Sequence, residues 1–332
     1  MKLHVNYPDG GYDIIVARGA LKSAGEIFDL GRKVLIVTDE GVPKEYAETV
    51  ASACANVEIL TVPQGEQSKS METLELVLGR MLKLSFGRGD CVVAVGGGVP
   101  GDLAGFAASV YMRGVDYYSV PTTLLSQVDS SIGGKTAVNF GGIKNIIGSF
   151  YRPRGVLIDP DVLRTLDERQ FAAGMAEVVK MALTFDRALF EFIERADARA
   201  KIDEIIPRAL AIKKQVVEKD EREAGLRRAL NFGHTIGHGI EAAAKGKLLH
   251  GECVALGMLP MCSVEVRARL LPVLKKLGLP TDLTVDANAV YEALLHDKKG
   301  DGESVYIVRV EQIGSYIIEK VPFEALKNEV IK

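Results

Sequence analysis

The sequence is poor in histidine and cysteine and has no long apolar run. It contains five histidines and four cysteines in 332 residues. Cys54, Cys91, Cys253 and Cys262 form no C-x-x-C pair, so we expect buried thiols in a reducing compartment rather than disulfides. No stretch of about 18 apolar residues could span a bilayer, and Met1–Tyr7 lacks the basic start and apolar core of a signal peptide. These absences predict a cytoplasmic protein with no membrane partner.

The chain also lacks a marked excess of charge of either sign. Its 41 basic and 44 acidic residues leave a formal net charge of -3. Such a balance gives no general attraction to nucleic acid or to an anionic membrane, so we expect no nucleic-acid partner. Any bound anion must therefore be held by a local cluster. The length fits two domains of ordinary size.

The first half of the chain alternates short apolar runs with helical stretches such as residues 70–84. Runs rich in valine and isoleucine suit strands of a parallel sheet that is buried on both faces, joined by right-handed crossovers. The first two expected strands flank Pro8-Asp-Gly-Gly11, which indicates a hairpin. The predicted strands are Leu3–Tyr7, Tyr12–Ala17, Val34–Val37, Glu58–Val62, Cys91–Val95, Tyr117–Val120 and Val156–Ile158.

After Asp159-Pro160 the pattern changes to helical periodicity. A strand pair around Gly314 and a short helix from Phe323 are expected near the end. We predict an α/β domain over 1–160 and a mainly helical domain over 161–332. The predicted helices of the second domain span 168–183, 187–196, 202–218 and 227–244, with more to about 295, and the strand pair spans 305–310 and 316–318.

A glycine-rich turn follows the predicted strand Cys91–Val95 and reads Gly96-Gly-Gly98-Val-Pro-Gly101-Asp102-Leu-Ala-Gly105. Glycines between a strand and a helix let the backbone approach a phosphate, and the helix start offers free N–H donors. The spacing differs from the common G-x-G-x-x-G, and such turns are structural as often as functional. Asp39, after the strand 33–38, could hold a ribose hydroxyl or cap a helix.

A second polar run extends from Pro121 to Asn139 and continues to Lys144-Asn145. It mixes glycines, hydroxyls, an acid and two lysines, Lys135 and Lys144, a composition that suits the binding of phosphate and sugar groups. A solvated loop is the alternative. We expect a long functional loop, because long loops in compact domains are usually functional or disordered and this one is too apolar for disorder.

Three of the five histidines, His234, His238 and His250, fall within seventeen residues. Neutral imidazole is a common zinc ligand, so the cluster indicates a metal or acid/base centre. Spacing alone would make His234 and His238 co-ligands, because residues four apart share one helix face. Glu177 and Lys180 also share a helix face, which by itself indicates a surface ion pair.

Five segments taken together resemble, in order, the signatures of the 3-dehydroquinate synthase family. They are the turn 96–106, the run Pro121–Asn139, Ala176-Glu-Val-Val-Lys180, Asn231-Phe-Gly-His-Thr-Ile-Gly-His238 and Leu249-His-Gly-Glu252. The resemblance covers essentially the whole chain. It implies a Rossmann-like NAD-binding domain, a helical metal domain and an active site in the cleft between them.

The resemblance implies that Glu177, His234 and His250 bind zinc or cobalt, and that His238 instead lies near the substrate phosphate. It implies NAD contacts from several residues that follow the predicted strands. These are Asp39, Glu66, Lys69, Gly97, Gly98, Asp102, Thr122, Thr123, Asp129 and Lys144.

Catalytic and substrate-binding roles are implied in the same way. Lys213 and Arg227 match the residues that hold the substrate carboxylate, and Arg113 matches an arginine supplied by the neighbouring subunit of a homodimer. The implied catalytic residues are Lys135, Lys144, Asn145, Lys180 and His238. The implied substrate contacts are Arg113, Lys135, Asn145, Lys213, Arg227, Asn231, His238 and one of Lys298 and Lys299.

The implied reaction is the second step of the shikimate pathway. It converts the sugar phosphate 3-deoxy-D-arabino-heptulosonate 7-phosphate to 3-dehydroquinate and phosphate by transient oxidation with NAD, elimination, reduction, ring opening and aldol closure. Pro100 and Ile143 depart from the family pattern and could shift the geometry of their loops.

Two alternatives remain open. A 2-deoxy-scyllo-inosose synthase would share the NAD and metal machinery but act on a substrate without a carboxylate, which Lys213 and Arg227 disfavour. A metal-dependent alcohol dehydrogenase of the glycerol dehydrogenase type would release NADH, and the phosphate-binding residues Lys135, Lys144 and Asn145 disfavour it.

Overall fold

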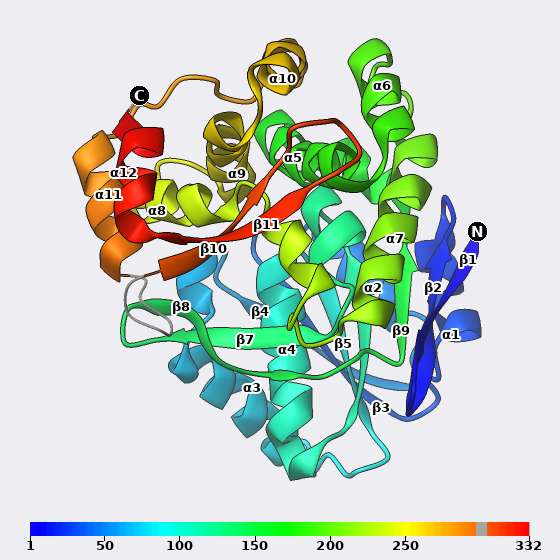
Figure 1. The fold of residues 1–332 in the computed structure, drawn as a ribbon. Coiled ribbons are helices and arrows are strands. Elements are labelled where there is room, and N and C mark those ends of the chain that lie inside the picture. The colour runs from blue at the N-terminus through cyan, green and yellow to red at the C-terminus, as the bar shows by residue number, and fades with distance from the viewer. Residues whose placement is uncertain (297–303, 332) are drawn as a thin grey trace. The chain divides into compact units, whose positions relative to one another are not determined.

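The computed structural model describes residues 1–296 and 304–331 and is drawn in Figure 1. The chain divides into two compact units, Met1–Leu166 and Asp167–Lys332. The first is an α/β unit and the second is mainly helical, as the sequence predicts.

The first unit is built on a seven-stranded sheet with the order β1-β2-β9-β6-β5-β3-β4. The edge strand β1 is antiparallel to β2 and forms the expected hairpin, while all the other neighbours are parallel. The predicted parallel sheet is therefore confirmed. Its strands are β1 (Lys2–Tyr7), β2 (Gly10–Val16), β3 (Lys33–Asp39), β4 (Asn56–Val62), β5 (Cys91–Gly96), β6 (Asp116–Pro121) and β9 (Gly155–Ile158).

Helices cover both faces of this sheet, which explains the continuous apolar strands. Along β3, Leu35 and Val37 belong to one core cluster, and Val34 and Ile36 belong to the other. The first cluster includes side chains of α3 (Met71–Lys83) and α4 (Gly98–Val110). The second includes side chains of α1 (Ala24–Ile27) and α2 (Lys44–Ala51).

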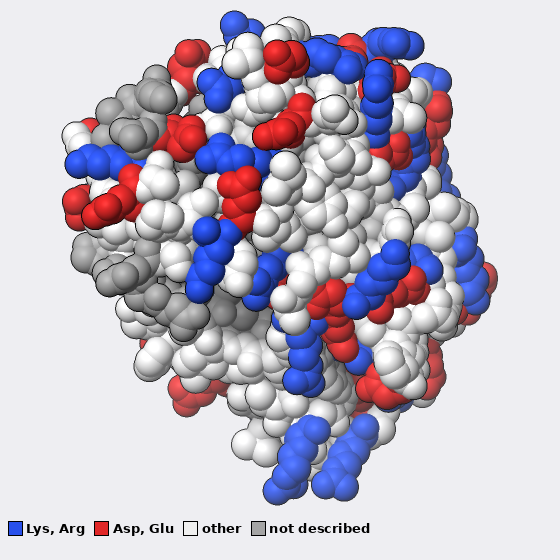
Figure 2. Space-filling view, viewed as in Figure 1, with Lys and Arg blue, Asp and Glu red and all other residues white. Residues whose placement is uncertain are grey.

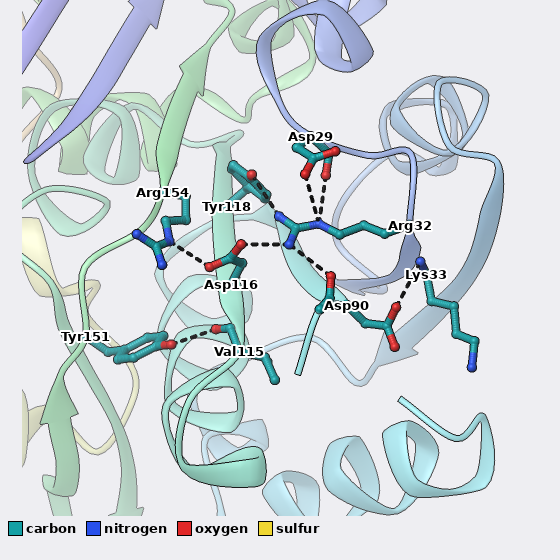
Figure 3. Close-up of polar contacts among 10 residues, drawn as sticks. Asp29, Arg32, Lys33, Asp90, Val115, Asp116, Tyr118, Tyr151 and Arg154 are labelled. Atoms are coloured by element: carbon teal, nitrogen blue, oxygen red, sulfur yellow. Dashed lines mark hydrogen bonds and ion pairs between the residues drawn. The ribbon is translucent and has the colours of Figure 1, made fainter. Parts of the chain in front are cut away.

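An ionic network joins the amino ends of three of these strands (Figure 3). Arg32 Nη1 donates to Asp116 Oδ2 at 2.7 Å, and Arg32 Nη2 donates to the Tyr118 hydroxyl at 3.0 Å. Arg154 Nε donates to the other oxygen of Asp116 at 2.6 Å. The contacts fix the starts of β3, β6 and β9. They lie at the edge of the sheet opposite to the carboxyl ends, so they stabilise the scaffold.

The expectation of one long polar loop after residue 121 is wrong. A short π-helical turn (Ser126–Ser130) is followed by a hairpin of β7 (Lys135–Phe140) and β8 (Ile143–Phe150). Gly141 and Gly142 have φ values of 58° and 79°, the positive values that a tight two-residue hairpin turn requires. Ile143 comes directly after this turn, as the first residue of β8.

The second unit consists of packed helices and a small antiparallel sheet. Its strand pair, β10 (Ser304–Arg309) and β11 (Ile317–Pro322), lies where the sequence predicts it. The helices are α5 (Glu168–Phe185), α6 (Arg187–Arg195), α7 (Ile202–Lys219), α8 (His234–Ala244), α9 (His250–Met258), α10 (Val264–Lys276), α11 (Ala287–His296) and α12 (Phe323–Ile331).

The predicted helix over 227–244 is wrong at its start. A 3-10 turn covers Leu226–Asn231, and α8 begins only at His234. Gly233 separates the two with a φ of 78°. A Cβ atom on Gly233 would lie 2.6 Å from Met258 Cγ and 2.8 Å from the Val254 carbonyl oxygen. The break therefore lets α9 pack closely against the residue that precedes α8.

Positive and negative side chains are interspersed on the face of the molecule in Figure 2. Within residues 1–296 and 304–331, no helix combines the length and apolarity needed to cross a membrane.

Candidate functional site

The residues expected to contact a dinucleotide lie at the carboxyl edge of the parallel sheet. β3 has β4 on one side and β5 on the other, so the chain reverses its direction across the sheet between β3 and β5. Asp39 ends β3, and Gly97 and Gly98 follow β5 at this switch point. Open α/β sheets bind ligands in the crevice outside such a point. The fold thus brings the acidic residue and the glycine-rich turn to neighbouring strand ends.

The glycine-rich turn leads directly into α4. Helix starts leave their first N–H groups without partners in the helix and favour bound anions. Pro100 lies in the first turn of α4, where its missing N–H removes no helical hydrogen bond. A Cβ atom on Gly97 would lie 3.1 Å from Thr123 Cγ2, and one on Gly105 would lie 2.5 Å from Thr136 Cγ2. A side chain at Gly105 would clash with Thr136, whereas one at Gly97 would require only a small shift of Thr123.

Asp39 is buried and does not cap a helix. Its Oδ1 accepts a hydrogen bond from the Gly41 N–H at 2.8 Å, whereas α2 starts only at Lys44. Burial raises the pKa of Asp39, and the backbone N–H groups of Gly41 and Val42 oppose that shift. The N-cap alternative is therefore wrong.

Lys69 is the centre of a buried polar cluster that joins three segments. Only 4% of this residue is exposed. Its Nζ lies 2.6 Å from Asp102 Oδ2 on α4, 2.5 Å from Asn145 Oδ1 on β8 and 3.7 Å from Glu66 Oε1. Burial lowers the pKa of Lys69, but the carboxylates of Asp102 and Glu66 outweigh it and raise the pKa. Four residues with expected roles therefore form one polar cluster, in which Lys69 pairs with two carboxylates and one amide.

Asn139 belongs to the same cluster and was not identified as a site residue from the sequence. Its side-chain oxygen accepts the Asn145 N–H at 2.8 Å, and its Nδ2 donates to Glu66 Oε1 at 3.0 Å. Its own N–H donates to the Lys69 carbonyl at 2.7 Å. Asn139 thus fastens the β7–β8 hairpin to the segment after β4. Only the hairpin pairing reveals this role, because Asn139 has no distinguishing sequence pattern.

The remaining expected residues of the first unit lie on or next to the polar run. Thr122 is buried, and the Thr123 hydroxyl lies 2.8 Å from the Ser126 hydroxyl. Asp129 belongs to the π-helical turn. Lys135, Lys144 and Arg113 are exposed. A small cavity is lined by residues that include Gly97, Asp102, Ser130 and Lys135.

In the second unit, Glu177, His234 and His250 come together from three helices. Glu177 lies in α5, while His234 and His250 are the first residues of α8 and α9. One potential ligand atom from each residue lies within 4.8 Å of the other two. The Nε2 atoms of His234 and His250 are 3.7 Å and 3.4 Å from Glu177 Oε1. Tetrahedral zinc ligands lie about 3.3 Å apart, so this spacing fits a metal ion.

The electrostatics of the cluster also fit a cation. Glu177 is fully buried, and neither of its oxygens makes a hydrogen bond, although Lys180 forms an ion pair with Oε2. Burial raises the pKa of Glu177, but the charges of Lys180 and the histidines outweigh it and hold the pKa well below its usual range. Burial and Lys180 lower the pKa of His234, whereas the carboxylates of Glu177 and Glu241 outweigh burial and raise the pKa of His250 to about 10. A carboxylate and neutral imidazole are suitable zinc ligands.

Close packing of α9 keeps these ligands together. A Cβ atom on Gly251 would lie 2.0 Å from the Ala173 carbonyl oxygen in α5, and one on Gly257 would lie 2.1 Å from the Gly233 carbonyl oxygen. Any larger side chain at either position would push α9 away from its neighbours, so both glycines are needed for the geometry of the cluster.

His238 is exposed and lies beside the other two rings, with its centroid 5.4 Å from that of His234 and 6.0 Å from that of His250. It forms a second potential cation group with Glu241 and His250. Glu241 was not identified from the sequence, although it is three residues after His238 and therefore on the same helix face.

The other basic residues expected in the site are buried in the second unit. Lys180, Lys213 and Arg227 are 1%, 7% and 3% exposed. The expectation of a surface ion pair between Glu177 and Lys180 is therefore wrong, because α5 is covered on the side that carries both. Asn231 donates from Nδ2 to the Glu223 carboxylate. Lys298 and Lys299 lie outside the described residues.

Known proteins are similar to this chain over nearly its whole length. Residues 59–173 match the family model for the 3-dehydroquinate synthase N-terminal region, and residues 174–300 match the model for the C-terminal region. The 3-dehydroquinate synthase of Streptococcus sanguinis is 43% identical, with 99% of each chain covered.

Two solved structures have closely similar folds. One is a 2-deoxy-scyllo-inosose synthase with carbaglucose-6-phosphate, NAD+ and Co2+, at 27% identity, a TM-score of 0.91 and 99% coverage of each chain. The other is a 2-epi-5-epi-valiolone synthase from Streptomyces hygroscopicus with NAD+ and Zn2+, at 30% identity, a TM-score of 0.86 and 96% coverage of each chain. The sequence matches and these folds agree, and the chain belongs to the 3-dehydroquinate synthase family.

Proposed function

We propose that the chain converts 3-deoxy-D-arabino-heptulosonate 7-phosphate to 3-dehydroquinate and phosphate. The full-length similarity to curated 3-dehydroquinate synthases carries this proposal. The grouping of Glu177, His234 and His250 supports it independently, because these are the residues to which the family motifs assign the metal.

NAD and a zinc or cobalt ion are the cofactors in this proposal. Asp39, Gly97 and Gly98 at the β3/β5 switch point would hold the dinucleotide, and the Lys69 cluster would support them. Glu177, His234 and His250 would hold the metal. When bound, the metal supplies a Lewis acid for the substrate's hydroxyl groups, and NAD accepts and returns a hydride.

The basic residues would bind the two anionic groups of the substrate. The exposed Lys135 and Lys144, together with Arg113, Asn231 and His238, are assigned to the phosphate. Asn145 Oδ1 accepts a hydrogen bond from Lys69, so its amide nitrogen is the group that can donate to phosphate. Lys213 and Arg227 are assigned to the carboxylate. Lys180 would place a positive charge beside Glu177.

Substrate choice separates this function from that of a 2-deoxy-scyllo-inosose synthase. Two buried cations, Lys213 and Arg227, suit a substrate that brings a carboxylate. A dehydrogenase of the glycerol dehydrogenase type would need neither these cations nor the phosphate-binding lysines.

Phosphate release from two substrates tests this assignment. The purified chain with zinc and NAD should release phosphate from 3-deoxy-D-arabino-heptulosonate 7-phosphate and not from glucose 6-phosphate. Lys213→Met should raise KM for the first substrate. Release from glucose 6-phosphate alone would instead support the inosose synthase.

A homodimer in the cytoplasm completes the proposal. Val110, Met112 and Phe150 are 44%, 47% and 46% exposed, and a hydrogen bond of 2.8 Å between the Ser109 and Ser149 hydroxyls joins their segments. These apolar side chains next to Arg113 suit a contact with a second copy. Light scattering of the wild type and of Met112→Asp tests this surface.

The four free cysteines suit a reducing compartment.

A further inference from the structure

We propose that Glu241 is a positioning residue for the metal site, which fixes His250 in the tautomer that presents Nε2 to the metal. The inference rests on the proposed metal site of Glu177, His234 and His250. Glu241 Oε2 lies 3.1 Å from His250 Nδ1, and Glu177 Oε1 lies 3.4 Å from His250 Nε2. The two nitrogens of one ring therefore face two different carboxylates.

The chemistry of the ring determines what each carboxylate can do. An ionised carboxylate only accepts hydrogen bonds, so a ring nitrogen that faces one carries a proton unless a metal ion takes its place. With the metal on the Glu177 side of the ring, Nδ1 is the nitrogen that donates to Glu241. In a neutral imidazole the other nitrogen, Nε2, then keeps its lone pair. Histidine ligands of metals usually donate their second N–H to such a carboxylate, which also fixes the orientation of the ring.

The position of Glu241 on α8 suits this role. It is seven residues after His234, and residues separated by seven lie on the same face of a helix. One helix thus supplies both a ligand and the support for the next ligand. The His250 side chain is 34% exposed, so without Glu241 water could compete for Nδ1 and the ring could turn. The Glu241 side chain is itself only 17% exposed.

A competing arrangement would place the cation among His238, Glu241 and His250, whose ligand atoms also lie within 4.8 Å. The burial of Glu177 favours the first arrangement. Its side chain is fully buried and pairs with Lys180 alone through Oε2, whereas the Glu241 side chain is 17% exposed and His238 is exposed. A desolvated carboxylate gains more from a bound cation than a solvated one does.

Zinc affinity of the substrate-free, full-length chain tests the proposal, measured by competition with a chromophoric chelator. Glu241→Ala should weaken zinc binding about 10- to 100-fold. Glu241→Gln should lose less zinc affinity, because its amide oxygen still accepts the hydrogen bond from His250 Nδ1. His238→Ala is the matched control on the same helix and should bind zinc within about twofold of the wild type, since it contributes neither a ligand nor this hydrogen bond.

Three results would overturn the proposal. Wild-type affinity in Glu241→Ala would show that His250 needs no support, and the metal site itself would stand. Loss of zinc in His238→Ala as deep as in His250→Ala would place the cation on the other group. A wild type that binds no zinc would remove the metal site from the proposed function as well.

Nuclear magnetic resonance gives a readout that does not depend on the alanine variant folding. Long-range 1H–15N spectra of the zinc-loaded wild type, labelled at its five histidines, should show His250 protonated at Nδ1. Protonation at Nε2 would contradict the proposed tautomer.

Discussion

Arg169 and Glu252 form a bidentate ion pair between the first turns of α5 and α9. Arg169 Nε and Nη2 donate to the two oxygens of Glu252 at 2.6 Å and 2.7 Å. Glu252 also accepts the Leu249 N–H at 2.7 Å and so caps the helix that begins with His250. The pair connects the helix of Glu177 to the helix of His250 beside the candidate metal ligands.

Replacing Arg169 should therefore weaken metal binding as well as stability. Glu252 is buried, so Arg169→Met would leave a desolvated carboxylate with fewer donors, at a cost of about 1–3 kcal/mol. Thermal unfolding and zinc titration would check this. Arg187→Ala removes an exposed ion pair with Glu191 and is the control, with little change expected in either measurement. Unchanged zinc affinity in Arg169→Met would contradict the positioning role.

Alanine variants of His238 and His250 should differ in zinc content and in the rate of phosphate release. His250→Ala should lose zinc, because it removes one of three ligands. His238→Ala should keep zinc but release phosphate slowly, because His238 is assigned to the leaving group. Metal analysis of the two purified variants and their steady-state rates separates these effects. Equal loss of metal in both variants would count against the assignment.

The Lys69 cluster should couple stability to NAD binding. Lys69→Met removes the cation from the carboxylate of Asp102 and should cost about 3 kcal/mol of the free energy of unfolding. The double variant Lys69→Met/Asp102→Asn should recover part of that loss, because no buried charge remains. Denaturant unfolding measures the loss of stability and its partial recovery. NAD titration of the same variants measures whether NAD binding weakens with the loss. Additive losses in the double variant would show that the two side chains are not coupled.

Asp116 should make the first unit sensitive to acid. Burial raises the pKa of Asp116, but hydrogen bonds from Arg154 and Arg32 outweigh burial and leave the pKa below its ordinary value of 3.8. A lowered folded-state pKa stabilises the fold above pH 3.8, and this contribution is lost as the pH falls below that value.

Asp116→Asn should consequently be less stable than the wild type at neutral pH, and the difference should shrink in acid. Asp29→Asn is the control, because Asp29 is 74% exposed and its ion pair with Arg32 is longer, at 3.7 Å. Urea unfolding as a function of pH checks the prediction. A difference that stays constant down to low pH would contradict it.

The sequence predicts those parts of the fold in which burial leaves a regular pattern of apolar residues along one segment. The valine- and isoleucine-rich runs predict the parallel strands because helices cover both faces of the sheet. Gly96, Gly97 and Gly98 predict the start of α4 because they directly follow such a run. Similarly, the spacing of His234 and His238 correctly places both residues on one helix.

Contacts between distant segments could not be predicted in this way. The break at Gly233 depends on the approach of α9, and the role of Asn139 depends on the pairing of β7 with β8. The spacing of Glu177 and Lys180 on α5 is the same for a surface pair and a buried one, so only the packing of the second unit distinguishes them. The candidate metal ligands Glu177, His234 and His250 follow from the family resemblance, whereas spacing alone favours His238 as the partner of His234.

The most direct test of the central claim is the balance between phosphate and NADH. The assay contains the purified chain, zinc, 3-deoxy-D-arabino-heptulosonate 7-phosphate, and NAD at a concentration well below that of the substrate. One phosphate should be released for each substrate molecule consumed, and NADH should not accumulate. NADH formed in proportion to substrate, without phosphate, would contradict the account and indicate a dehydrogenase.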